Sequence, residues 1–125
     1  MAKEIDYLEL ADILKLGQEI ISDFRIRDLG LLESAVARPR TSVFGEDAYP
    51  TFPDKVAALM HSIARNHALI DGNKRLAWSA ARLLCLMNDV DIKMNRDRAY
   101  ELVVAVASGQ IDLPELCVSL KKVIK

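Results

Sequence analysis

Apolar residues recur at the spacing of an α-helix through most of this chain, and breaks in that spacing divide it into six predicted helices. The predicted segments are an apolar stripe from Leu8 to Ile20, a helix from about Leu29 to Ala37, one that begins at Pro53, one from Asn73 to about Met87, one between Asn95 and Gly109, and one that follows Asp112. Apolar residues cover most of the circumference of the fourth helix, which predicts that it is the buried central helix. We therefore expect one compact all-α domain over residues 1–125.

The boundaries of these helices are marked by polar and turn-forming residues. The predicted N-terminal caps are Asp6 with Glu9, Thr51, Asn73, Asn95, and Asp112 with Glu115. Helical spacing is lost between residues 40 and 52, where Gly45 and Pro50 indicate turns, so we expect a loop or short hairpin there.

Composition places the chain in an ordinary class of globular proteins. Its 125 residues are 51% hydrophobic, which is enough for a core, and the net charge of −1 gives no general attraction to nucleic acid or to an anionic membrane. No segment approaches the roughly 18 uninterrupted apolar residues of a membrane span, and the N-terminus does not resemble a signal peptide. Cys85 and Cys117 lie in apolar helical patterns and are interpreted as core residues, so we expect a cytoplasmic protein.

The polar chemistry is concentrated at the junction of the third and fourth helices, in the nonapeptide His67-Ala68-Leu69-Ile70-Asp71-Gly72-Asn73-Lys74-Arg75. Gly72 permits a tight turn, and Lys74 and Arg75 then fall in the first turn of the next helix, where positive charge opposes the helix macrodipole. Free backbone N–H groups at a helix start, together with two cations, favour binding of an anion such as polyphosphate.

Two further residues complete a reacting set in the nonapeptide. Asp71 is a hard oxygen ligand suited to Mg²⁺, and a histidine such as His67 can take a proton from a hydroxyl near neutral pH. Each residue alone also has a structural interpretation, as a helix end, a turn or a solvated charge. Their clustering indicates a phosphoryl-transfer site.

The nonapeptide resembles the signature of the Fic/Doc superfamily, and specifically of its Doc branch, the toxins of bacterial or phage toxin–antitoxin pairs. Fic proteins carry a pattern close to H-P-F-x-D/E-G-N-G-R, and Doc proteins have a lysine at its eighth position, which is Lys74 here. Ala68 and Leu69 depart from the proline and aromatic residue usual in Fic proteins. The resemblance also covers residues 30–35, 37–40 and 49–66.

This resemblance implies a Fic fold and protein kinase activity that uses ATP and Mg²⁺. Asp71 would hold the metal, and the phosphates would be cradled by Gly72, Asn73, Lys74 and Arg75. His67 would deprotonate a Ser or Thr hydroxyl of the protein substrate.

The eighth position of the signature bears on what is transferred. In the Fic branch, glycine there accompanies transfer of AMP, whereas in the Doc branch lysine accompanies a reversed nucleotide that presents its γ-phosphate, so Lys74 argues for a kinase. The resemblance implies translation elongation factor Tu as the target. It also implies that residues 40–52 form a flap that aligns the target beside His67.

The resemblance also raises the question of how such an activity is inhibited. Many Fic proteins inhibit themselves through the motif [S/T]-x-x-x-E-[G/N]; residues 42–47 nearly match it, but they lie in the expected flap, contain glycine and end in aspartate. We therefore expect a separate antitoxin protein whose C-terminal segment occupies a groove on this domain, and any DNA contact would belong to that partner. Two alternatives stay open: an AMP transferase that uses the same site, and a catalytically silent module that acts through its antitoxin complex.

Two other polar residues near the nonapeptide have weaker functional interpretations. His61 lies six residues before His67 and therefore on a different helix face, so it is interpreted as a structural or surface residue with no zinc site. Arg82 lies two turns after Arg75 on about the same face. It could reach the nucleotide, but a surface role is favoured.

Overall fold

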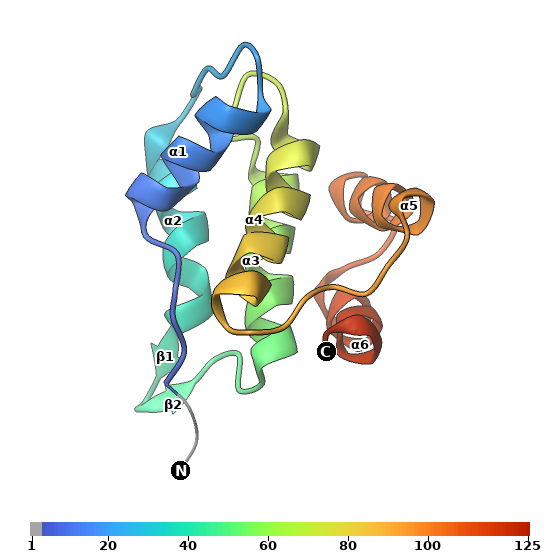
Figure 1. The fold of residues 1–125 in the computed structure, drawn as a ribbon. Coiled ribbons are helices and arrows are strands. Elements are labelled where there is room, and N and C mark those ends of the chain that lie inside the picture. Colours follow the sequence, from blue (N-terminus) through green and yellow to red (C-terminus); the bar gives the residue numbers. More distant parts are fainter. Residues whose placement is uncertain (1–3) are drawn as a thin grey trace.

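The computed structural model describes residues 4–125 and folds them into six α-helices, one 3₁₀ turn and one two-stranded hairpin (Figure 1). The elements are α1 (Leu10–Ile20), α2 (Leu29–Ala37), the 3₁₀ turn (Arg38–Arg40), β1 (Ser42–Val43), β2 (Glu46–Asp47), α3 (Phe52–Asn66), α4 (Asn73–Met87), α5 (Arg96–Ala107) and α6 (Leu113–Val123). The all-α class and the six helices predicted from the hydrophobic pattern are confirmed.

The central helix is α3, and not the Asn73–Met87 helix that the sequence pattern indicated. α3 packs against α2, α4, α5 and α6, and it lies in the middle of the molecule, with α1 and α2 on one side and α5 and α6 on the other (Figure 1). α4 buries one face against α3 and α1, but it leaves Lys74, Arg75 and Arg82 exposed. The hydrophobic pattern overestimated the burial of α4 because its alanines count as apolar around the helix, whereas only one face of α4 packs closely against other helices.

Three of the predicted helix caps are confirmed. The side chain of Thr51 accepts from the backbone N–H of Asp54, and Asp54 in turn accepts from Thr51 N–H, which completes a capping box on α3. Asn95 caps α5, and Asp112 with Glu115 forms the capping box of α6. These caps satisfy N–H groups that a helix start leaves without a partner.

Two predicted caps are wrong. α1 begins at Leu10 with Glu9 as its cap and Asp12 as the reciprocal partner, whereas the backbone of Asp6 pairs with Asn88 from the end of α4. α4 is capped by Gly72 in a left-handed conformation, and Asn73 is the first residue of the helix. Both residues are bound otherwise, since Asn88 binds the backbone of Asp6 and Leu69 binds the amide of Asn73.

The hairpin predicted between residues 40 and 52 is present, but it does not lie beside His67. β1 and β2 pair antiparallel, and the buried ammonium of Lys55, in the first turn of α3, bonds to Asp47 of β2 and to the backbone oxygen of Tyr49. His67 follows the other end of α3, so a helix of about 22 Å separates the two (Figure 1). The expected position of residues 40–52 next to the histidine is therefore wrong.

Both cysteines are free, and they are packed as the sequence indicated. Cys85 is fully buried in the core, and Cys117 is half-buried. Burial raises the pKa of the Cys85 thiol to about 12 and that of the Cys117 thiol to about 11, which keeps both protonated and unreactive. Within residues 4–125, no helix has the length and apolar character needed to cross a membrane.

Candidate active site

The loop between α1 and α2 runs beside the nonapeptide and pairs with it like a short strand. Ala68 accepts from the backbone N–H groups of Arg27 and Asp28, at 2.8 and 3.0 Å, and Ile70 N–H donates to the carbonyl of Arg25 at 3.1 Å. These bonds form an antiparallel bridge between Ile26 and Leu69. The start of the nonapeptide is therefore held by a segment some forty residues earlier in the chain.

His67 occupies a backbone conformation that favours glycine. Its φ and ψ are 54° and 45°, in the left-handed region, and it ends α3 there. Its carbonyl accepts from the guanidinium Nε of Arg27 at 2.7 Å, and the amide of Asn66 fixes the same turn through Leu31 and Ala68. The His67 side chain is exposed and makes no hydrogen bond within the described residues. A strained backbone that its surroundings enforce is typical of functional sites.

The turn into α4 is tight because of Gly72 and Asn73. Gly72 has a φ of 91°, and a Cβ there would lie 2.7 Å from Cδ1 of Ile21, so a side chain at this position would force Ile21 to shift. The amide of Asn73 accepts from Leu69 N–H at 3.0 Å and donates to the Leu69 carbonyl at 3.1 Å. This side chain therefore fixes the loop.

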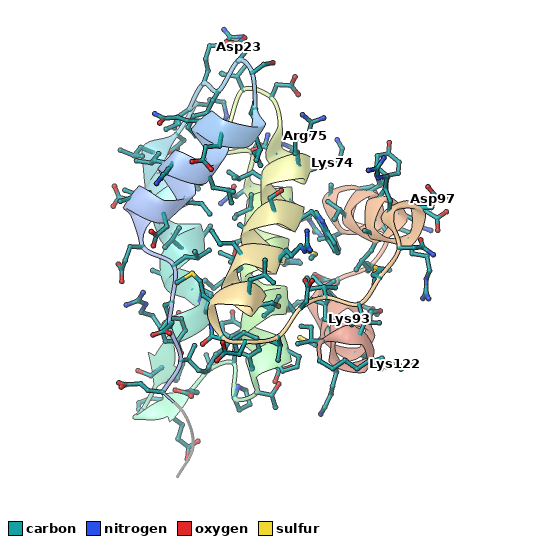
Figure 2. The ribbon with its side chains drawn as sticks, in the orientation of Figure 1. Asp23, Lys74, Arg75, Lys93, Asp97 and Lys122 are labelled. Atoms are coloured by element: carbon teal, nitrogen blue, oxygen red, sulfur yellow. The ribbon has the colours of Figure 1, made fainter. Side chains whose placement is uncertain are left out.

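The first turn of α4 presents unpaired donors and positive charge together. The first intrahelical bond runs from Leu76 N–H to the Gly72 carbonyl, so in the part of the chain described here the N–H groups of Asn73, Lys74 and Arg75 have no acceptor. Lys74 has no ion pair among residues 4–125, and Arg75 donates to the carbonyl of Ile20 at 3.3 Å. Figure 2 shows both side chains at the loop end of α4. The arrangement suits an anion with several oxygens.

A groove of about 1130 Å³ opens at this end of α4, between α4 and α5. The predicted site residues that line it are His67, Asp71, Gly72, Asn73, Lys74 and Arg75. The fold thus brings every residue singled out in the nonapeptide to one cavity. Its volume exceeds the roughly 300–1,000 Å³ of common small-molecule pockets, so it has room for a nucleotide.

Three carboxylates line this cavity, and Asp71 is the one that has no ion pair among the described residues, because Asp23 pairs with Arg25 and Asp91 with Arg82. One oxygen of Asp71 accepts from Gly72 N–H at 2.9 Å, and the side chain is exposed. No group of three or more His, Cys, Asp or Glu side chains in residues 4–125 forms a metal cage. A single carboxylate fits Mg²⁺, which keeps several waters and takes phosphate oxygens for its other ligands.

The comparisons with known proteins agree with the residues of this site. Residues 7–85 match the sequence profile of the Fic/DOC family. The chain belongs to the Fic/Doc family. Over 118 residues it is 45% identical to the protein named Toxin Doc of Mycolicibacterium smegmatis, an alignment that covers 92% of this chain and 91% of that protein. The resemblance read from the nonapeptide is confirmed, and the family is one of transferases.

His61 and Arg82 lie outside the Fic/Doc nonapeptide and have partners of their own. His61 bridges Arg38 and Asp112, at 3.1 and 2.9 Å, and so joins the end of α2 to the start of α6 through α3. Arg82 forms a two-pronged ion pair with Asp91, at 3.0 and 3.2 Å. Arg82 also lines the groove, so its position agrees with the favoured surface role without excluding a ligand.

Sequence reasoning missed several residues that shape the Fic/Doc site. Arg27 holds the His67 turn, Ile21 packs where a Cβ at position 72 would lie, and Tyr100 of α5 lines the far wall of the groove. Arg27 and Ile21 carry no local signal, because their partners lie forty or more residues away. Tyr100 is 68% exposed in the structure, and the sequence offered one signal for it, an aromatic residue outside the apolar stripe of its helix.

Proposed function

We propose that this chain is the toxin of a toxin–antitoxin pair and acts as a Doc-type protein kinase, using ATP and Mg²⁺ to phosphorylate a Ser or Thr hydroxyl of elongation factor Tu in the cytoplasm. The observation that carries the proposal is the convergence of His67, Asp71, Lys74 and Arg75 on one groove at the free N-terminus of α4. The relative named Toxin Doc supports it. Phosphoryl transfer needs positioning and charge neutralisation, and this set of residues supplies both.

Each residue has a distinct task in this proposal. The backbone N–H groups of α4 and the side chains of Lys74 and Arg75 bind the phosphates, and Asp71 is the protein ligand of Mg²⁺. His67 accepts the proton of the target hydroxyl as that oxygen attacks phosphorus. The ring of His67 makes no hydrogen bond within residues 4–125, which leaves both ring nitrogens open to this role.

In this proposal the segment of the protein substrate that carries the hydroxyl binds along residues 25–27, and not along the distant hairpin. One edge of this segment pairs with the nonapeptide through Arg25 and Arg27, so in antiparallel geometry the N–H and carbonyl of Ile26 face the opposite edge. Neither group has a partner in the described part of the chain. An extended peptide can add to such an edge by main-chain hydrogen bonds, which would set its hydroxyl beside His67.

Inhibition is assigned to an antitoxin protein whose C-terminal segment occupies a groove on this domain. Residues 42–47, which nearly match a self-inhibiting motif, form the hairpin at the far end of α3 from His67. They are therefore badly placed to close the site.

The test is intact-mass analysis of elongation factor Tu incubated with this protein, ATP and Mg²⁺. We expect a gain of about 80 Da for one phosphate, and none with His67→Ala. A gain of about 329 Da would mean AMP transfer and would overturn the interpretation of Lys74. Val118→Ala is a matched control, since Val118 is an exposed residue of α6 that does not line the groove.

Absence of any gain, with ATP still bound, would contradict this target. Two explanations would then remain, a kinase with another substrate and a catalytically silent module. Incubation with a bacterial lysate and labelled ATP distinguishes them. Labelling that depends on His67 requires catalysis, whereas its absence would leave binding of the antitoxin as the activity of the domain.

A further inference from the structure

The groove extends well beyond the residues that the phosphates require. Along α4 its wall is formed by Lys74, Trp78 and Arg82, which are spaced four residues apart and so lie on one face of the helix. From Lys74 to Arg82 this face runs for about 12 Å along the helix axis. The groove thus continues from the free N-terminus of α4 past the chain's one tryptophan.

The opposite wall is one face of α5. Its lining residues are Tyr100, Val103, Val104 and Ala107, which follow the three- and four-residue spacing of a single helix face. Tyr100 is 68% exposed, and with Ile70 it is one of two large exposed apolar side chains, among the described residues, that line this groove. An aromatic ring at the open edge of a cavity offers a flat apolar surface to a ligand.

The charged residues around these walls favour a ligand with an anionic end. Lys93 and Arg96 line the groove near α5, and both are exposed. The ion pair of Arg82 with Asp91 also lines the groove, one turn beyond Trp78 on α4. A cationic, aromatic cavity continuous with a phosphate site is suited to a nucleotide more than to an apolar side chain.

We infer that the part of the groove between Trp78 of α4 and Tyr100 of α5 is the subsite for the base of the nucleotide, and that the Tyr100 ring stacks on that base. The inference rests on the proposed function, because it takes ATP as the ligand and places its phosphates at Lys74 and Arg75. Tyr100 is a binding and positioning residue in this arrangement. It does not touch the reacting phosphorus.

The test compares ATP with inorganic tripolyphosphate, which carries the same phosphates without a base. Binding of each to the full chain is measured by calorimetry with Mg²⁺ present, for the wild type, Tyr100→Ala and Tyr100→Phe. We expect Tyr100→Ala to weaken ATP binding about tenfold or more, because one base–aromatic stack is lost, and to leave tripolyphosphate binding unchanged. Tyr100→Phe keeps the ring and should bind ATP as the wild type does.

Trp78 provides a second measurement on the same samples. As the one tryptophan of the chain it reports on this part of the groove alone. A base beside it should quench its fluorescence, so ATP should quench more strongly than tripolyphosphate at saturation. Val118→Ala, on the exposed side of α6, should behave as the wild type in both measurements.

The outcomes separate this inference from the proposed function. If Lys74→Ala weakens ATP binding but Tyr100→Ala does not, the base lies elsewhere and the inference is wrong while the function stands. Equal loss of ATP and tripolyphosphate binding in Tyr100→Ala would show a general structural defect and would also overturn it. If the wild type binds neither ligand, the proposed function fails, and the inference fails with it.

Discussion

The side-chain amide of Asn73 pairs with both backbone polar groups of Leu69, as a neighbouring strand would. The same arrangement occurs at the other end of α4, where the amide of Asn88 pairs with the N–H and the carbonyl of Asp6, at 2.9 Å each. One pair fixes the nonapeptide, and the other fixes the N-terminal segment. The two amides therefore form a matched set for experiment.

Asn73→Ala should lower the free energy of unfolding by about 1–3 kcal/mol, because the part-buried N–H and carbonyl of Leu69 lose their partners. It should also reduce phosphoryl transfer. Asn88→Ala removes bonds of the same kind away from the groove and should lower stability without loss of transfer measured well below its melting temperature. Equal activity losses in the two variants would contradict a specific role for Asn73 in the loop.

Gly72→Ala should be more destabilising than Gly109→Ala, although the two glycines have similar backbone angles, with φ of 91° and 82°. A Cβ at position 109 meets nothing closer than 3.9 Å, whereas a Cβ at position 72 lies 2.7 Å from Ile21. The cost of placing alanine at a positive φ, about 1 kcal/mol, is common to both variants. The difference between their free energies of unfolding therefore measures the clash with Ile21. Chemical denaturation gives both values.

The clash at position 72 can be tested further by removing the atom responsible. Ile21→Val deletes Cδ1, so in the Gly72→Ala background it should recover part of the lost free energy of unfolding. In the wild-type background the same change should cost about 0.5–1.5 kcal/mol. If Ile21→Val were equally destabilising in both backgrounds, steric exclusion at Gly72 would be ruled out.

Arg27→Ala should lower the rate of transfer about tenfold or more while nearly preserving ATP affinity. Arg27 touches the His67 carbonyl and none of the residues assigned to the phosphates, so its loss moves the proposed base and leaves the α4 N-terminus in place. Arg98→Ala is the control, since Arg98 is an exposed arginine of α5 that does not line the groove. An effect on KM for ATP alone would argue against a positioning role for Arg27.

The start of a helix could be predicted from the sequence wherever its capping residues lie within a few positions of each other. Thr51 and Asp54 cap each other three residues apart, so the start of α3 could be predicted from the sequence around it. The cap assigned to Asp6 failed because its backbone is bound by Asn88, 82 residues later. The cap assigned to Asn73 failed because Leu69 binds that amide, a contact that depends on the shape of the loop.

The candidate site divides in the same way. The residues that carry the chemistry are consecutive in the chain, so one motif revealed His67, Asp71, Lys74 and Arg75. The residues that hold or complete the site come from α1, from the loop after it and from α5. Only the packing of the helices brings them near, and no local periodicity encodes that packing.

Lys55 should control the order of the hairpin more than the stability of the whole fold. Its side chain is 2% exposed, and its ammonium bonds to Asp47 and to the Tyr49 carbonyl. Lys55→Met keeps the buried volume and should change the free energy of unfolding by less than about 1 kcal/mol, because Asp47 is already exposed to water. Hydrogen exchange should then be faster at Ala48, whose N–H bonds to Thr41.

Lys55→Ala separates the two contributions of this side chain. It removes the same ionic contact but also leaves a cavity, which should cost about 2–4 kcal/mol in global stability. Protection of Ala48 that stays at the wild-type level in both variants would mean that the Lys55 ammonium does not anchor the hairpin.

The ion pair of Asp91 with Arg82 should make a measurable contribution to acid unfolding. The hydrogen bond from Arg82 is the main reason that the pKa of Asp91 lies below its usual value. A lowered pKa in the folded state stabilises the fold above the unfolded-state value of about 3.9, and this contribution disappears as the pH falls through the folded-state value. Asp91→Asn should therefore reduce the loss of stability below about pH 4.

This pH dependence is measured as the free energy of unfolding between pH 7 and pH 2. Asp91→Asn should be less stable than the wild type at pH 7, and the two curves should converge in acid. Glu33→Gln, at an exposed position of α2 with no ion pair in the described residues, serves as the control. Curves for Asp91→Asn and wild type that stay parallel throughout would remove Asp91 as a contributor.

The left-handed backbone at His67 means that the proposed catalytic residue destabilises the fold. A side chain at a φ of 54° costs about 1 kcal/mol relative to glycine, a cost that the Arg27 contact must offset. Replacement by glycine would remove the imidazole and the strain in one step. Loss of the proposed base through this one substitution therefore carries no backbone penalty, and the inactive protein would keep its fold and the rest of its surface.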